Sequence, residues 1–221
     1  MNITYLGHSA FEIKTDNGSI LIDPFLICSP NYNPQGVTDI FVTHGHGDHL
    51  GSAIDISKNT GAKITAVFEL ANYCAKHGAN TIDMGLGSWM EYEWGKAILV
   101  PAFHSSTTPE GQYAGCPCGV VLQIEGRTIY HAGDTCLNSE MKVIGEVYQP
   151  DIVMLPIGGK YTMDIEHAAI AAKWLNATAV IPMHYNTFDA IKVDIEDFNR
   201  EIKLINKIPT VLPVGCTLSN I

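Results

Sequence analysis

Residues 41–52 read FVTHGHGDHLGS and gather three histidines and one aspartate within six positions. The preceding apolar residues predict a buried strand that ends here, so the chain must turn. Gly45 and Gly47 remove side-chain bulk at the turn and let the neighbouring polar side chains converge on one volume. Converging imidazole and carboxylate groups are the donors that divalent cations bind. The stretch therefore predicts a metal site built on these four residues: His44, His46, Asp48 and His49.

Further candidate ligands stand where other apolar runs stop. His104 follows AILVPAF, Asp134 follows RTIYHAG, and His184 follows TAVIPM. A lone histidine after a strand is more often structural, but three such placements beside the dense cluster favour ligands. We expect His131, three residues before Asp134, to support a ligand and not to be one.

Composition limits the functional classes. The chain has 221 residues, with 13 basic and 23 acidic side chains and a formal charge of −10. This shortage of Lys and Arg argues against nucleic acid or an anionic membrane as a partner. The N-terminus resembles no signal peptide and no long apolar run could span a bilayer, so we expect a cytoplasmic protein with its cysteines as thiols. Cys116 and Cys118 could bind a metal, although packing is the simpler interpretation.

The order of elements predicts an α/β fold. Strands and an Asp16-Asn17-Gly18 hairpin open the chain, followed by helices at 50–61 and 69–78 with a strand at 62–68 between them. Strands return from 88 to 133, and helices then alternate with strands. We list the helices expected there: 139–149, 164–176 and 193–206. Two similar halves, each a sheet covered on one side by helices, predict a four-layer α-β-β-α sandwich in one domain, residues 1–221.

Several motifs resemble those of a known family. Four of them are similar to the metal motifs of the metallo-β-lactamase superfamily: HGHGDH at 44–49, FHSS at 103–106, HAGDT at 131–135 and PMHY at 182–185. YLGHSAFEI at 5–13 and ILIDPF at 20–25 resemble the branch of small cytoplasmic metal-dependent hydrolases that includes ascorbate-6-phosphate lactonase-like proteins. More distantly, they are similar to the phospholipase D that acts on N-acyl-phosphatidylethanolamines. The resemblance covers essentially the whole chain.

The resemblance implies a dinuclear centre. One metal would be held by His44, His46 and His104. The other would be held by Asp48, His49 and His184, with Asp134 bridging both. We expect two divalent ions, zinc first, with manganese or iron as alternatives. A shared hydroxide would attack a carbonyl carbon or a phosphorus, and Asp48 would orient it.

Three more residues are candidates beside this centre. His8 would face the cleft and donate to a substrate oxyanion, or else hold the Ser9 turn. Asp23 would accept a hydrogen bond from a ligand imidazole and fix its tautomer, or else shape the turn before Pro24. Lys160 stands in a glycine turn before a helix that Asp164 should cap, where an anion could bind.

The sequence therefore favours a hydrolase that acts on a small, polar ester, lactone or phosphoester. A phosphodiesterase of the same fold is the close alternative. A diiron redox protein is a different class, but such sites resemble H-x-E-x-D, and His46 occupies the glutamate position. A non-catalytic metal-binding protein is the third possibility. We expect a small-molecule substrate and, from exposed strand edges and relatives in this branch, a homo-oligomer.

Overall fold

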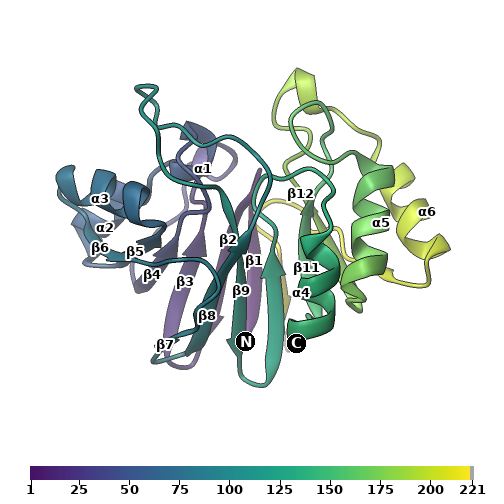
Figure 1. The fold of residues 1–221 in the computed structure, drawn as a ribbon, viewed down its shortest axis with the longest axis horizontal. Coiled ribbons are helices and arrows are strands. Elements are labelled where there is room, and N and C mark those ends of the chain that lie inside the picture. Colours follow the sequence, from purple (N-terminus) through teal and green to yellow (C-terminus); the bar gives the residue numbers. More distant parts are fainter. Residues whose placement is uncertain (220–221) are drawn as a thin grey trace.

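Two mixed β-sheets face each other in the computed structural model, which describes residues 1–219 (Figure 1). The first sheet has the order β14-β1-β2-β3-β4-β5-β6. Its strands are β1 (Asn2–Gly7), β2 (Ala10–Thr15), β3 (Gly18–Ile22), β4 (Val37–Phe41), β5 (Lys63–Ala66), β6 (Asn80–Asp83) and β14 (Thr217–Ser219). The strands from β1 to β3 pair antiparallel, and those from β3 to β6 pair parallel. The predicted hairpin thus joins β2 to β3.

The second sheet repeats this plan in the order β13-β12-β11-β10-β9-β8-β7. Its strands are β7 (Met90–Tyr92), β8 (Gly95–Pro101), β9 (Cys118–Ile124), β10 (Arg127–His131), β11 (Ile152–Pro156), β12 (Ala179–Met183) and β13 (Ile208–Pro209). Pairing is antiparallel from β7 to β10 and parallel from β10 to β13. Both halves therefore begin as hairpins and continue as strand–helix crossovers, as the sequence pattern predicts.

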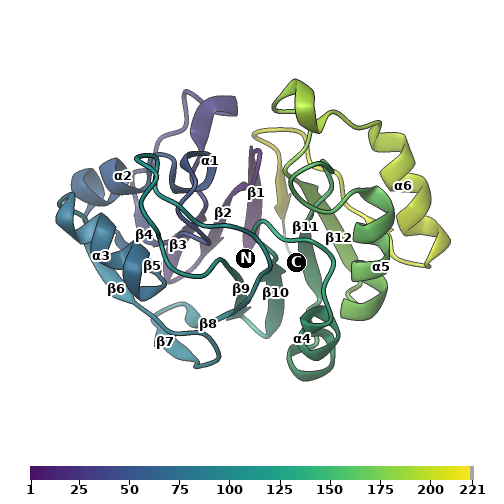
Figure 2. The same cartoon turned by 45° about the horizontal axis from the view of Figure 1, so that its top comes forward.

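Helices cover the outer face of each sheet (Figure 2). The first half carries α1 (Gly47–Leu50), α2 (Ala53–Thr60) and α3 (Phe68–Lys76), and α2 and α3 contact β4, β5 and β6. The second half carries α4 (Glu140–Tyr148), α5 (Ile165–Leu175) and α6 (Ile195–Leu204), of which α5 contacts β11 and α6 contacts β13. The four-layer α-β-β-α sandwich is confirmed. No helix among residues 1–219 is long and apolar enough to cross a membrane.

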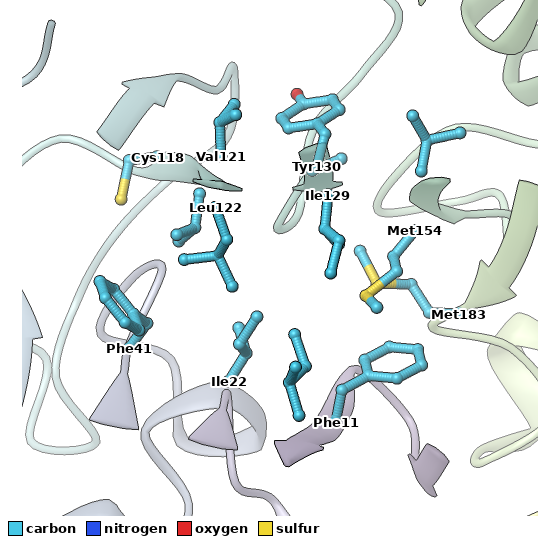
Figure 3. Close-up of a cluster of buried hydrophobic side chains, with 14 of the residues drawn as sticks. Phe11, Ile22, Phe41, Cys118, Val121, Leu122, Ile129, Tyr130, Met154 and Met183 are labelled. Atoms are coloured by element: carbon cyan, nitrogen blue, oxygen red, sulfur yellow. The ribbon is translucent and has the colours of Figure 1, made fainter. Parts of the chain in front are cut away.

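The core lies between the two sheets. Figure 3 shows Phe11, Ile22 and Phe41 of the first sheet opposite apolar side chains of the second. The labelled partners that face them are Leu122, Ile129, Met154 and Met183. Because alternate residues of a strand point to opposite faces, each strand gives one set of side chains to this layer and the other set to the helices. This packed layer fixes the two sheets relative to each other.

Local differences from the sequence prediction are confined to short elements. The strand that the sequence predicts before the histidine motif spans 37–41, because residues 42–46 already belong to the turn of the motif. β6, α1 and the two 3-10 helices, η1 (Leu26–Cys28) and η2 (Asp189–Ile191), were not predicted. Cys118 is buried and its thiol donates to the Thr43 carbonyl at 3.2 Å, while Cys116 is exposed. That placement supports packing for Cys118.

The position of Phe41 leads to a stability prediction. Its ring is fully buried and packs edge-on against Tyr92 and Trp94. Phe41→Ala should lower the free energy of unfolding by about 3–5 kcal/mol, because it leaves a cavity in the core. Phe68→Ala, at a side chain that is 60% exposed, should change it by less than about 0.5 kcal/mol. Urea unfolding of both variants in the presence of a chelator measures the difference, and equal effects would contradict this assignment of the core.

Candidate metal centre

The candidate ligands come from the carboxyl ends of strands that run in the same direction. In the first sheet β3 and β4 are parallel, and β1 shares their direction because β2 is antiparallel to both β1 and β3. The same argument applies to β8, β10 and β12 of the second sheet. The residues that follow these six strands gather at one rim, near α1 at the top of Figure 1. We list them in chain order: His8, Asp23, the 44–49 motif, His104, Asp134 and His184.

Three histidines form the first group of donors. His44, His46 and His104 each offer a ring nitrogen, and these atoms lie within 4.8 Å of one another. The Nε2 atom of His44 is 3.0 Å from the Nδ1 atom of His46. The rings of His44 and His104 stand edge to face, with centroids 5.1 Å apart. This arrangement directs ring nitrogens from two sheets toward a common point.

A second group combines histidines with carboxylates. His8, Asp48, His49 and His184 offer donor atoms within 4.8 Å of one another, and His44, His49 and Asp134 form an overlapping group. Asp134 lies between the two groups. Its Oδ2 atom is 3.0 Å from His184 Nε2 and 3.5 Å from His104 Nε2, and its Oδ1 atom is 3.2 Å from His49 Nε2. The structure thus brings all seven predicted ligands to one place.

Unpaired buried atoms test whether a cation fits this centre. His49 Nε2, Asp134 Oδ1 and His184 Nδ1 have no hydrogen-bond partner among residues 1–219. A buried polar atom left without a partner costs about 1–3 kcal/mol, so its presence calls for an explanation. His49 Nε2 and Asp134 Oδ1 face each other, and a bound divalent cation would satisfy both. The donor set therefore fits a metal ion.

The charges of the centre also favour a bound cation. Burial would raise the pKa of Asp134, yet the His49 and His184 imidazoles hold it well below its ordinary value. Burial would lower the pKa of His49, yet Asp134 and Asp23 hold it well above its ordinary value. Burial keeps the pKa of His44 well below its ordinary value. Asp134 is thus an ionised carboxylate and His44 a neutral imidazole. The space between the Asp134 and Asp23 carboxylates, where His49 lies, favours positive charge.

Comparison with known proteins shows the family to which this chain belongs. The model of the beta-lactamase superfamily domain matches residues 2–184. A UPF0173 metal-dependent hydrolase of Bacillus cereus is 42% identical, and the match covers 97% of this chain and 98% of the relative. One from Methanosphaera stadtmanae is 46% identical over 92% of both. The chain belongs to the beta-lactamase superfamily. It is a metal-dependent hydrolase.

A solved structure supports the same family assignment. Igni18, described as a novel metallo hydrolase from Ignicoccus hospitalis, superposes with a TM-score of 0.88 at 35% identity. The match covers 98% of this chain and 97% of that one. The narrower resemblance to ascorbate-6-phosphate lactonase-like proteins remains a prediction.

Asp23 links the two groups of donors in the hydrolase. Its Oδ2 atom accepts hydrogen bonds from the Thr43 hydroxyl and from His49 Nδ1, both at 2.7 Å. Its Oδ1 atom accepts from the Thr43 backbone N–H at 2.8 Å. Since the Thr43 hydroxyl proton is used, that oxygen accepts from His44 Nδ1, 3.0 Å away. With a metal bound, both imidazoles would then present an Nε2 lone pair to the centre.

His131 connects the sheets next to the centre. Its Nε2 atom donates to the carbonyl of Ser9 at 2.9 Å, and its Nδ1 atom accepts from the Gly133 N–H at 3.1 Å. The ring is fully buried and both nitrogens are satisfied. It therefore ties the turn after β1 to the loop that carries Asp134.

Close packing explains one glycine of the histidine motif and not the other. A Cβ atom on Gly45 would lie 2.5 Å from the Cβ atom of Ala114 and 2.9 Å from the Thr107 carbonyl oxygen. A side chain at Gly47 would meet only Pro109, at 3.9 Å. Gly45 thus allows the loop after His104 to cross the motif, whereas Gly47 is not required for space.

Lys160 is not among the donors that converge. It is exposed, and its ammonium lies 5.1 Å from the centre of the Tyr161 ring. Asp164 caps α5 as predicted, because its side chain accepts from the His167 backbone N–H at 2.8 Å. A role for Lys160 in anion binding remains a prediction.

The sequence did not point to Thr43 or Thr187. Thr43 directly precedes the motif, and a threonine at a strand end carries no signal of its own. The Thr187 hydroxyl forms a hydrogen bond with His8 Nδ1 at 3.0 Å, although 179 positions separate the two residues. Three site residues also adopt left-handed backbone conformations, with φ of 55° at His8, 46° at Asp23 and 54° at His184. Such positions cost about 1–3 kcal/mol each and cluster at functional sites.

The relay from Asp23 leads to a prediction on metal affinity. Asp23→Asn should weaken metal binding about 10- to 100-fold, because it disturbs the partners that orient His44 and His49. Competition with a chromogenic chelator measures the dissociation constant.

Asp39→Asn provides the matched control. Asp39 is a nearly buried carboxylate on β4 that accepts from the Trp94 indole at 2.9 Å and precedes the motif. It should leave metal affinity unchanged. Equal affinities for the two variants would show that Asp23 does not orient the ligands.

Proposed function

We propose that the hydrolase binds two divalent ions and hydrolyses a small ester, lactone or phosphoester. The observation that carries the proposal is the convergence of histidine and aspartate donors at one buried rim, where His49 Nε2 and Asp134 Oδ1 lie 3.2 Å apart without a hydrogen-bond partner among residues 1–219. Zinc is the first candidate, since imidazole nitrogens dominate the donor set, with manganese or iron as alternatives.

The proposed ligands divide into two groups. His44, His46 and His104 would hold one ion. Asp48, His49 and His184 would hold the other. The two Asp134 oxygens lie within 3.5 Å of histidines from both groups, which supports a bridging position for this carboxylate.

The chain's own residues prepare this chemistry. When bound, two divalent ions would lower the pKa of water toward neutrality and stabilise negative charge that develops on the substrate. Asp48 is the most accessible of the carboxylates, with a side chain that is 33% exposed. Burial would raise the pKa of Asp48, but the His8 and His49 imidazoles hold it below its ordinary value. An ionised Asp48 can accept a proton from attacking water and return it to the leaving group.

The same residues would serve attack on carbon and attack on phosphorus. A phosphodiesterase therefore remains the close alternative, and a panel of chromogenic esters, lactones and bis-aryl phosphodiesters separates the two. A diiron redox reaction is less well supported, because His46 stands where such sites carry glutamate. Metal analysis with a visible spectrum of the purified protein tests that alternative.

A partly apolar pocket beside the histidine motif suggests which group the substrate carries. The pocket has a volume of about 470 Å³, and Gly47 of the motif forms part of its wall. The apolar part of the wall is Phe25, Leu26, Ile27 and Pro30, and Ser29, Tyr32 and Ser52 add polar groups. Ile27 is 60% exposed at this wall, where its side chain could contact a substrate. We infer that the substrate carries an apolar group beside its scissile bond, which adds to the small, polar ester, lactone or phosphoester expected from the sequence.

The proposed ligands lead to a prediction on turnover. His46→Ala and Asp48→Ala should lower kcat at least about 100-fold on any substrate of the panel, while the fold is retained. Asp55→Ala, at an exposed acidic residue of α2, should keep the original rate. Steady-state kinetics with circular dichroism as the check on folding measures this. Full activity of either ligand variant would rule out the proposed site.

The apolar pocket leads to a separate prediction on selectivity. Ile27→Asp should lower kcat/KM for an aryl hexanoate about tenfold relative to an aryl acetate, because apolar contacts in the pocket are lost. Val143→Asp, at a half-exposed residue of α4, is the control and should leave the ratio unchanged. If the wild-type enzyme hydrolyses both esters without preference for chain length, the pocket does not bind the acyl group.

A further inference from the structure

His8 is held more firmly than a flexible substrate-binding residue needs to be. Its backbone carbonyl accepts from the Tyr5 hydroxyl at 3.0 Å and from the His184 N–H at 2.7 Å. Its ring is inaccessible to solvent and lies against Phe25 and Phe188, with centroids 5.6 Å away in each case. The carbonyl contact ties the turn after β1 to the strand end that carries His184. The ring therefore has one orientation.

Two polar contacts show which group each ring nitrogen of His8 faces. Nδ1 lies 3.0 Å from the Thr187 hydroxyl oxygen, and Nε2 lies 3.3 Å from Asp48 Oδ2. The Thr187 hydroxyl donates to the Tyr185 carbonyl at 3.4 Å. Its oxygen is then free to accept from His8 Nδ1–H. A neutral His8 with its proton on Nδ1 turns an Nε2 lone pair toward a carboxylate oxygen.

This arrangement repeats the one found between His49 and Asp134. There, a ring nitrogen and a carboxylate oxygen face each other at 3.2 Å, and Asp23 fixes the far side of the ring. At His8 the separation is 3.3 Å, and Thr187 takes the place of Asp23. With the His8 proton on Nδ1, a cation beside both atoms would satisfy His8 Nε2 and Asp48 Oδ2 together. Metal-binding histidines typically donate their other N–H to a second protein group, as His8 does to Thr187.

We propose that His8 is a further ligand, through Nε2, of the ion assigned to Asp48, His49 and His184. The four residues already place donor atoms within 4.8 Å of one another. The inference rests on the dinuclear centre proposed above and adds a nitrogen donor to one of its two positions. It also changes the expected role of His8, because a coordinated Nε2 cannot donate a hydrogen bond to a substrate oxyanion.

The additional donor affects which metal this position prefers. With Asp134 shared, the second position has five protein donors and the first has four. Zinc sites commonly hold four ligands, and catalytic ones reserve one of them for water or substrate. A position with five protein donors suits an ion that accepts five or six ligands, such as manganese(II), iron(II) or cobalt(II). The two positions would therefore differ in affinity for cobalt(II), which makes that ion a useful probe.

The experiment titrates the metal-free protein with cobalt(II) and records the visible spectrum and the dissociation constant of each ion by chelator competition. His8→Gly removes the ring and suits the left-handed backbone at this position. It should weaken the second ion at least about tenfold and change its absorption, with the first ion unaffected. Thr187→Val should weaken the second ion about tenfold, whereas Thr187→Ser, which keeps the hydroxyl, should bind as the wild type does.

The controls separate the possible failures. His167→Ala removes an exposed histidine of α5 and should leave both binding steps unchanged. If the wild-type protein binds only one cobalt ion, the dinuclear proposal fails and the His8 inference with it. If the wild type binds two and His8→Gly binds both with unchanged affinity and spectrum, only the His8 inference is overturned. If His8→Gly does not fold, the Thr187 pair decides, and equal binding by Val and Ser variants overturns the inference.

Discussion

The candidate metal centre depends on the hydrogen bonds of the buried Asp23 carboxylate. It lies at the end of β3 with no solvent exposure, and one oxygen accepts from both Thr43 and His49. Through Thr43 it also sets the tautomer of His44. One side chain therefore orients donors in both proposed metal positions. Because a buried carboxylate is costly unless each lone pair is satisfied, Asp23 in turn requires β3 and β4 to stay in register.

The core supplies the rigidity that this network needs. The crowded imidazoles of the centre repel one another when they are protonated, and three left-handed residues add strain. The two sheets resist both effects because their apolar faces are packed against each other over most of their length. His131 and His8 extend that connection to the rim, since each makes a hydrogen bond from one sheet to the other. A cation bound at this rim would then need little movement of the scaffold.

The sequence predicts the layers and the ligands for one physical reason. Each ligand follows an apolar run, and parallel strands of a crossover fold end at the same edge, so residues distant in sequence must meet there. The partners of those ligands could not be predicted in the same way. The contacts of Thr187 with His8 and of His131 with Ser9 join residues 179 and 122 positions apart. They depend on how the two sheets are placed, which no local pattern records. Short elements such as β6 and α1 were missed because their residues lack a periodic pattern.

The charge of the centre differs from that of the whole protein, and this difference affects which substrates the site favours. The protein carries a formal charge of −10, which repels anions at long range. With neutral histidines on bound metals, Asp48 and Asp134 give the seven proposed ligands a charge of −2, so two divalent ions would bring the centre to +2. Asp23 lowers that value by one. A locally positive centre in an acidic protein favours substrates that are neutral on approach and become negative during reaction. Neutral esters and lactones meet that condition better than phosphodiesters do, and an apolar pocket at Ile27 would strengthen the preference.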